Sequence, residues 1–273
     1  MRSGRGAAIA LRIATGVLFL FYLVPAAIVF INSFKSNTEI VTAPAAVVFT
    51  PTLDGYRDVV NPSLFQAFGN SAIIALGSAV VTILLATPLA YGLSRIPVKW
   101  TGVIIGVLIA LQMTPTSTSI IPLFRIMAEL KLLNNLIGVI FAVTATAVPF
   151  VALILRPFFL SIPQDVFEAA HVDGASAMRV FTAVAVPLSR NGILLIGILT
   201  FIAGWGDLIY SVSFLNNGSL YPFSVLIAQQ TTLYGTQWNS LMALGMVGAV
   251  PTIILFAFVS KRLSTGLTLG ASK

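Results

Sequence analysis

The sequence predicts an all-α membrane protein, a polytopic bundle of six transmembrane helices with both termini in the cytoplasm. Of its 273 residues, 58% are hydrophobic and only 8% are charged. Because soluble domains carry about 25% charged residues, this composition excludes a soluble enzyme, a disordered tail and a nucleic-acid-binding domain. The few charges also leave uncharged stretches of about 20 apolar residues, the length that a membrane-spanning helix needs. We treat residues 1–273 as a single domain.

The intervals between charged residues set the bounds of each span. The predicted spans are residues 11–33, 69–94, 102–122, 134–158, 191–213 and 239–260. The last two share one interval between Arg190 and Lys261, which only Asp207 interrupts, and the polar residues 216–218 separate them. Basic residues precede the first span as in a signal peptide, but its apolar run exceeds the roughly 7–15 residues of such a segment. We therefore expect the first span to be retained.

The placement of Lys and Arg sets the predicted orientation. With the N-terminus inside, eleven of the 15 basic residues fall in inner segments and four in outer ones. Cytoplasmic loops of membrane proteins collect Lys and Arg, so this bias places both termini in the cytoplasm and accounts for the net charge of +7. The sequence has no cysteine and a single histidine, His171, so disulfides, thiolate catalysis and a Cys-based or all-His metal site are excluded.

Two segments outside the spans are predicted to carry structure of their own. Residues 32–69 are too polar to span and contain several prolines and aromatic residues, which favours a structured extracytoplasmic loop over a plain spacer. In residues 120–133 apolar positions recur at helical spacing, which is typical of a short amphipathic helix at the outer membrane interface.

Residues 161–187 predict two short helices joined by a sharp turn. Pro163 suits the first turn of a helix, and Asp173-Gly174 is a turn signal because glycine accepts a positive φ. Ser176 is a good N-cap for a second helix, which has to end near Pro187.

The same segment has the composition of a docking surface. Ala169 and Ala170 leave a smooth face that another surface can approach closely, while Glu168 and Asp173 place negative charge where an inner loop usually carries positive charge. A soluble partner docking on this segment is the functional interpretation. The alternative is a solvated loop that only returns the chain to the membrane.

These residues resemble the EAA signature of ATP-binding-cassette importer permeases: Glu168-Ala169-Ala170, then Asp173-Gly174-Ala175, with Pro187 downstream. More widely, the chain is similar to the MalG-type carbohydrate permeases of that family. Further matching motifs are Ser33-Phe34-Lys35, Thr52-Leu53-Asp54-Gly55-Tyr56, Asn70-Ser71, Trp205-Gly206-Asp207 and the glycine-rich segment 266–271. The family often has Asn where this chain has Gly206, so no substrate contact is carried over to that position.

The resemblance implies a MetI/MalG-like permease fold, with a core bundle over residues 69–260 and a cytoplasmic coupling loop over 161–187. It implies a subunit of a heterotetramer in a prokaryotic inner membrane. The implied partners are a second homologous permease, two ATPase subunits and an extracytoplasmic solute-binding protein. The implied cargo is a sugar, amino sugar or glycerol phosphate derivative.

The resemblance also implies roles for single residues. Glu168 would form a salt bridge with an ATPase arginine, Ala169 and Ala170 would pack in the ATPase cleft, and Gly174 would supply the turn. The C-terminal segment 264–273 would also contact the ATPases. The rigid helices of the loop would then pass the motion of the ATPases to the fourth and fifth spans.

The chain is expected not to be an enzyme and to bind no cofactor of its own. It has no G-x-x-x-x-G-K-[ST] segment to hold phosphates, so ATP and Mg²⁺ belong to the partner subunits. Two other function classes are a gradient-driven carrier or channel and an intramembrane enzyme. A single intramembrane acid, Asp207, argues against a proton relay, and no His cluster or Ser/His/Asp spacing supports an enzyme.

Polar residues inside the predicted spans are the candidates for the translocation path. An ionised Asp at the bilayer centre costs about 2.5–3.5 kcal/mol, so Asp207 either lines the path with Trp205 or is a structural residue near a helix end. Gln112 and Thr116 lie in a polar run around Pro115, which is expected to bend the third span. Their hydroxyl and amide groups either line the path or satisfy freed backbone groups.

No catalytic residue is expected. We expect Asn70 and Ser71 to cap the second span.

Overall fold

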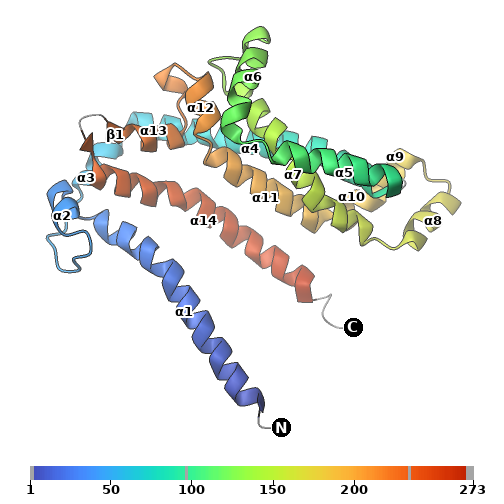
Figure 1. Ribbon diagram of the computed structural model, residues 1–273, viewed down its shortest axis with the longest axis horizontal. Coiled ribbons are helices and arrows are strands. Elements are labelled where there is room, and N and C mark those ends of the chain that lie inside the picture. The colour runs from blue at the N-terminus through green and yellow to red at the C-terminus, as the bar shows by residue number, and fades with distance from the viewer. Residues whose placement is uncertain (1–2, 96–97, 233–234, 269–273) are drawn as a thin grey trace. The chain divides into compact units, whose positions relative to one another are not determined.

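The computed structural model describes residues 3–95, 98–232 and 235–268, which are mainly helical (Figure 1). The first half contains α1 (Ser3–Asn32), α2 (Asn37–Thr42), α3 (Asp54–Val59), α4 (Pro62–Arg95), α5 (Val98–Gln112), α6 (Thr116–Glu129) and α7 (Leu136–Leu160). The second half contains α8 (Gln164–Val172), α9 (Ala177–Arg179), the π-helix η1 (Val180–Ala185), α10 (Val186–Leu188), α11 (Arg190–Trp205), α12 (Ile209–Phe214), the 3-10 helix η2 (Gly218–Leu220), α13 (Phe223–Gln229) and α14 (Trp238–Thr268). Strands β1 (Thr231–Thr232) and β2 (Gly235–Thr236) form a short antiparallel pair. Residues 269–273 of the C-terminal segment that was expected to contact ATPases lie outside this description.

Four helical segments are long and apolar enough to cross a membrane: Ala10–Asn32, Pro62–Arg95, Leu136–Leu160 and Trp238–Phe258. Two further helix pairs pass the same test together but are sharply bent, α5 with α6 by 95° and the helices Ala177–Leu188 with α11 by 76°. The described residues therefore hold up to six spans, the predicted number, if each bent pair counts as one.

The third predicted span, residues 102–122, is wrong as a continuous helix. Helix α5 ends at Gln112 and α6 begins at Thr116, and Figure 1 shows α6 turning away from α5. The amide of Thr114 bonds the carbonyl of Leu111, a tight last turn, and Pro115 has no amide hydrogen with which to continue the helix. The bend expected at Pro115 is thus a full break. Helix α6 covers most of the predicted amphipathic segment but begins earlier.

The fifth predicted span, residues 191–213, is also interrupted. Helix α11 ends at Trp205, Gly206 is its C-cap, and α12 begins only at Ile209. The cause is the side chain of Asp207, which accepts hydrogen bonds from the first amides of α12, as described below. A new helix start is therefore built into the middle of this apolar stretch.

Asn70 and Ser71 do not cap the second span, because α4 begins eight residues earlier at Pro62. Asn61 precedes Pro62, and its side chain accepts the amide of Leu64, which is N-cap behaviour with Pro at the first helical position. Inside α4, the amide of Asn70 donates to the carbonyls of Ser219 and Tyr221, at 2.9 and 3.1 Å. The Ser71 hydroxyl accepts the amide of Phe223 at 2.8 Å. These two side chains fasten the segment after α12 to α4 instead of starting a helix.

The chain divides into two compact units. The smaller, residues 1–64 and 227–251, contains the loop after α1, which is structured as expected. Lys35 is fully buried there, its Nζ donates to the carbonyls of Ala43 and Pro44, each at 3.1 Å, and it lies 5.3 Å from the ring centroid of Phe49. Because a buried ammonium needs such partners, the loop is held in one conformation around Lys35 and is not a plain spacer.

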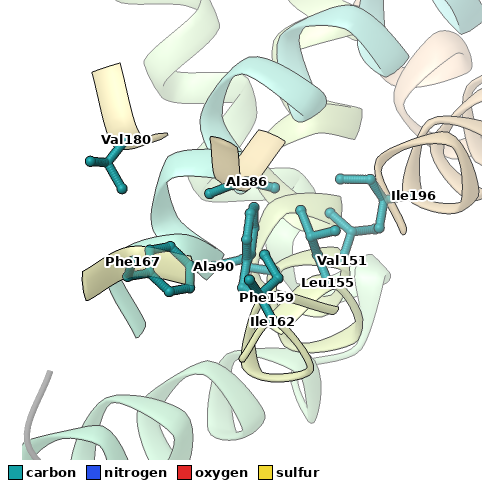
Figure 2. Close-up of a cluster of buried hydrophobic side chains, with 11 residues drawn as sticks. Ala86, Ala90, Val151, Leu155, Phe159, Ile162, Phe167, Val180 and Ile196 are labelled. Carbon is teal, nitrogen blue, oxygen red and sulfur yellow. The ribbon is translucent and has the colours of Figure 1, made fainter. Parts of the chain in front are cut away.

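The larger unit, residues 65–226 and 252–273, has a hydrophobic core that joins five helices. Figure 2 shows this cluster, whose buried members come from α4, α7, α8, η1 and α11, with Ile162 between α7 and α8: Ala86, Ala90, Val151, Ala152, Leu155, Phe159, Ile162, Phe167, Val180, Ala185 and Ile196. A Cβ on Gly204 would meet the backbone of Ala75 at 2.9 Å, so α11 and α4 approach closely through a glycine.

Candidate functional site

The turn between α8 and α9 has the geometry that the sequence predicts. Gly174 has φ of +74°, and its amide donates to the carbonyl of His171 at 3.0 Å. The amide of Ala175 donates back to the carbonyl of Ala170, also at 3.0 Å. These are the two hydrogen bonds of a Schellman motif, in which glycine takes the left-handed position. The chain therefore reverses sharply after α8.

The second helix of this segment begins and ends where the sequence indicates. The Ser176 hydroxyl accepts the amide of Arg179 at 3.4 Å as an N-cap. The helix then widens into the π-helical turn η1, and α10 ends at Leu188, one residue after Pro187. The two-helix prediction for residues 161–187 is confirmed.

Helix α8 has two contrasting faces. Phe167 is only 3% exposed, and Val166 and Ala170 pack against the same core. The opposite face is solvent-exposed and consists of Asp165, Glu168, Ala169 and Val172. The exposed face thus combines two carboxylates with an alanine and a bare valine side chain that is 88% exposed.

The exposed face of α8 presents groups that another protein could bind. In the described part of the chain, the ion pair found is Arg57–Asp54, so Glu168 has no cationic partner among the described residues of this subunit. Asp173 and Gly174 at the turn are exposed as well, and Met178 beyond it is 69% exposed. A carboxylate beside exposed apolar side chains can accept a charge-assisted hydrogen bond from another protein and bury apolar area at once.

A cavity of about 630 Å³ lies in the larger unit, at the break between α5 and α6. Its walls come from α5, α6, α7, α11 and α12, and its polar lining residues are Gln112, Thr114, Thr116, Ser119, Thr146, Thr200, Asp207 and Tyr210. The Gln112 side-chain amide donates to the carbonyl of Thr146 at 3.0 Å, which links α5 to α7. Gln112, Thr116 and Asp207, three of the four predicted path residues, are thus brought together around one cavity.

Asp207 lines this cavity and also starts α12. Its Oδ2 accepts the amide and the hydroxyl of Ser211, each at 2.9 Å, and its Oδ1 accepts the amide of Tyr210 at 3.4 Å. A carboxylate has about four lone-pair sites, so these three bonds leave it little spare acceptor capacity. The geometry gives Asp207 the structural role at a helix start, at the edge of the cavity.

Trp205 lies apart from the other three predicted path residues. It is 8% exposed, and its ring lies 5.4 Å from that of Phe68, 6.1 Å from Phe201 and 6.2 Å from Phe223. It is not among the residues that line the cavity. Trp205 is instead the centre of an aromatic group that packs α11 against α4 and α13.

Sequence reasoning missed Tyr210 as a cavity residue. Its side chain is 2% exposed, it lines the cavity, and its hydroxyl is among the buried polar atoms that have no hydrogen-bond partner in the described structure. Its position three residues after Asp207 was the available signal. That spacing becomes informative only when Asp207 is recognised as a helix start, which places both residues in the same first turn.

Residues 82–267 match the family described as the binding-protein-dependent transport system inner membrane component. The chain is 33% identical over 263 residues to the sulfoquinovosyl glycerol transport system permease protein SmoH of Agrobacterium fabrum, covering 96% of this chain and 92% of the relative. It is 27% identical to the glucose import system permease protein GlcU of Saccharolobus solfataricus, covering 93% and 91%. A crystal structure of a bacterial ABC transporter that imports alginate superposes with a TM-score of 0.76, at 23% identity, over 96% of this chain and 98% of the other.

The chain therefore belongs to the family of binding-protein-dependent transport system inner membrane components. This confirms the resemblance stated from the sequence and the permease fold that it implies. Membership of this family makes the chain a multi-pass inner-membrane protein and a non-enzymatic component of an ABC transport system.

Proposed function

We propose that the chain is one permease subunit of an ATP-driven importer and forms half of the pathway for a carbohydrate or a sugar-like solute. The observation that carries this proposal is the exposed acidic face of α8 on a rigid two-helix segment, in a chain of this family. Relatives whose names state a cargo support the carbohydrate class, since they include permeases for sulfoquinovosyl glycerol, glucose and diacetylchitobiose.

The proposed complex is a heterotetramer of two different permeases and two ATPase subunits, served by an extracytoplasmic binding protein. A structural neighbour with a TM-score of 0.68 is a bacterial alginate ABC transporter in complex with a periplasmic protein that carries an alginate pentasaccharide, which supports such an assembly. ATP and Mg²⁺ bind to the ATPases, and the chain itself holds no cofactor. The 161–187 segment and both termini lie on the cytoplasmic side.

In this proposal the outer face of α8 receives the ATPase. Glu168 pairs with an ATPase arginine, Ala169 enters the ATPase cleft, and the Asp173–Gly174 turn with Ala175 fixes the angle of the next helix. Ala170 supports α8 from its inner side, where it packs on the core. The two Schellman bonds favour docking at a defined angle, because they satisfy the last carbonyls of α8 and hold Gly174 in the left-handed conformation that reverses the chain.

The cavity is the proposed binding site for the solute in this subunit's half of the translocation path. Amide and hydroxyl groups can donate hydrogen bonds to sugar hydroxyls and accept them, and Gln112 and Thr116 present both kinds of group, while Asp207 holds the start of α12 at the edge of the cavity. Pro122, Leu123 and Phe150 supply apolar surface for the faces of a sugar ring. Trp205 acts through packing, because it holds α11 in place beside the cavity.

Co-purification with candidate ATPase subunits tests the docking proposal. Glu168→Lys reverses the charge on the exposed face and is expected to abolish co-purification and ATP-dependent uptake. Glu129→Lys is the matched control, because it makes the same charge reversal at an exposed acid of α6, outside the docking segment. Uptake by the isolated chain without an ATPase would overturn the proposal and favour the gradient-driven carrier or channel.

The cargo is tested through the binding protein and the cavity together. A binding screen of the cognate binding protein against mono- and oligosaccharides, amino sugars and glycerol phosphate esters identifies the solute. Gln112→Leu and Thr116→Val are then expected to lower uptake of that solute while ATPase co-purification stays normal. Unchanged uptake in both variants would remove the cavity from the path.

A further inference from the structure

The end of α4 is attached directly to the inner face of α8. The guanidinium carbon of Arg95 lies 3.5 Å from the ring centroid of Phe167, which is close cation–π geometry. The same guanidinium donates through Nη1 to the Oε1 of Gln164 at 3.2 Å. Arg95 thus holds α8 at two points on one face, and both are distinct from the exposed residues Glu168 and Ala169.

Tyr91, one turn earlier on α4, extends this attachment. Its ring centroid lies 6.5 Å from Phe167, 5.5 Å from Phe159 and 5.0 Å from Phe181. Four elements therefore meet around one tyrosine: α4, α7, α8 and η1. Figure 2 shows the Phe159 and Phe167 side chains in this region beside Ala90 of α4.

A second cation, Arg156 of α7, also binds the C-terminal end of α4. The Nε of Arg156 donates to the carbonyl of Leu93 at 3.1 Å, and Leu93 lies in the last turn of α4. The carboxyl end of α4 is therefore fixed to both α7 and α8.

Helix α4 also carries contacts at its other end. Asn70 and Ser71 bind the backbone of residues 219–223, and Gly204 of α11 packs on Ala75. One continuous helix of 34 residues thus connects the docking helix with the segment that follows α12, next to the broken fifth span.

We propose that Arg95 is a positioning residue that couples α8 to α4, so that α4 moves with the docking helix as one rigid body through the transport cycle. This adds α4 to the fourth and fifth spans, α7 and α11, to which the sequence analysis expects the motion to pass. The inference rests on the proposed function, because it takes α8 as the site where the ATPase pushes. A force on the outer face of α8 reaches α4 through the Arg95–Phe167 contact without an intervening loop.

The test uses the assembled complex of both permeases, the ATPases and the binding protein in proteoliposomes, and measures solute transported per ATP hydrolysed. Arg95→Gln is expected to leave ATPase co-purification intact and to lower this ratio about fivefold, the lower end of typical coupling effects. Arg95→Lys, which keeps the cation, restores part of the ratio. Lys99→Gln is the control, because it removes an exposed cation four residues further along and is expected to change nothing.

A covalent bridge provides the second arm. The chain has no cysteine, so the double variant R95C/Q164C carries the only two thiols for a short thiol-to-thiol reagent. Before the reagent is added, this variant is expected to transport less solute per ATP than the unmodified chain. Bridging α4 to α8 is then expected to restore that ratio. Restoration also shows that the variant is folded.

Three results would overturn the inference: an unchanged ratio in Arg95→Gln, loss of ATPase binding in that variant, or a bridged complex that cannot transport. The last result would mean that α8 and α4 have to separate during the cycle. Failure of the proposed function looks different, since the unmodified chain would then not retain ATPases at all.

Discussion

The 161–187 segment and the cavity differ in how far apart in the sequence their contacts lie. In the segment, the defining hydrogen bonds join residues at most five positions apart, such as Ala175 to Ala170 and Arg179 to Ser176. The cavity instead brings Gln112 and Thr116 together with Asp207 and Tyr210, about a hundred residues later in the chain. The conformation of the segment is therefore set by short-range contacts. The cavity, in contrast, depends on the break between α5 and α6 and the break between α11 and α12, which lie far apart in the sequence and meet in space.

This difference predicts different consequences of mutation. A change at the turn or on the exposed face of the segment acts locally, so we expect docking to be affected while the buried core is left intact. A change at a helix break acts on both the cavity wall and the course of the helix. Variants of the two regions are therefore expected to separate into those that lose partner binding and those that lose solute passage.

Among the variants at the helix breaks, the largest effect is expected at Asp207, where the helix start and the cavity coincide. Asp207→Ala removes the acceptor of the first amides of α12, which costs about 1 kcal/mol for a lost N-cap, and it opens the cavity wall. We expect uptake to fall about tenfold, equivalent to about 1.4 kcal/mol, with ATPase co-purification unchanged. Uptake by proteoliposomes and thermal unfolding of the purified subunit provide the measurements.

Asp207→Ser separates the two roles of this residue. Serine is a strong N-cap but carries no charge, so it preserves α12 while removing the carboxylate from the cavity. Because three donors already occupy the carboxylate, we expect Asp207→Ser to retain most of the uptake. Equal losses in the Ala and Ser variants would instead assign the carboxylate a direct contact with the solute.

The next largest effect is expected at Gly174 in the docking segment. At φ of +74°, and with nothing near its added Cβ, the only obstacle to a side chain is the backbone conformation. A β-branched residue there costs about 1–2 kcal/mol, so Gly174→Val is expected to weaken ATPase co-purification. Gly174→Asn is the milder control, because Asn tolerates this conformation. Equal behaviour of both variants would show that the turn is not what positions the second helix.

The sequence predicts the local region in detail and the cavity only in pieces. The turn at Asp173–Gly174, the Ser176 cap and the end near Pro187 are set by short-range backbone chemistry, which a sequence displays directly. Composition alone identifies the apolar stretches, but it does not indicate that the side chain of Asp207 restarts a helix. It also does not indicate that Asn70 and Ser71 bind residues about 150 positions away.

Tyr210 offers a smaller and sharper test of the cavity. Its hydroxyl is buried with no hydrogen-bond partner in the described structure, an arrangement that costs about 1–3 kcal/mol unless a ligand or water supplies the bond. Tyr210→Phe is therefore expected to raise the thermal unfolding temperature slightly and to increase the solute concentration for half-maximal uptake a few-fold. A more stable variant with unchanged uptake would show that the hydroxyl does not reach the solute.

The smallest effect is expected in the loop of the smaller unit, which belongs to neither region. Glu39 accepts the Ser36 amide at 3.3 Å and its hydroxyl at 3.1 Å, and the Thr50 amide at 3.4 Å. The hydrogen bond from the Ser36 backbone, followed by that from Thr50, lowers the pKa of Glu39 below its ordinary value. A lowered folded-state pKa means that the ionised carboxylate stabilises the loop above its unfolded value of about 4.3. This contribution is lost as the pH falls through the folded-state pKa.

Glu39→Gln is therefore expected to lower the unfolding temperature slightly at pH 7. The difference from the unmodified chain should shrink as the pH falls below the unfolded value of about 4.3, and it should vanish below the lowered folded-state pKa. Because Glu39 is still partly open to solvent, which screens its charge, the change in unfolding temperature is small even at its maximum. Uptake and ATPase co-purification should both stay normal, since this capping box holds only its own loop. If the variant instead loses uptake at neutral pH, the loop around Lys35 takes part in solute delivery, and a third functional region has to be added to the comparison.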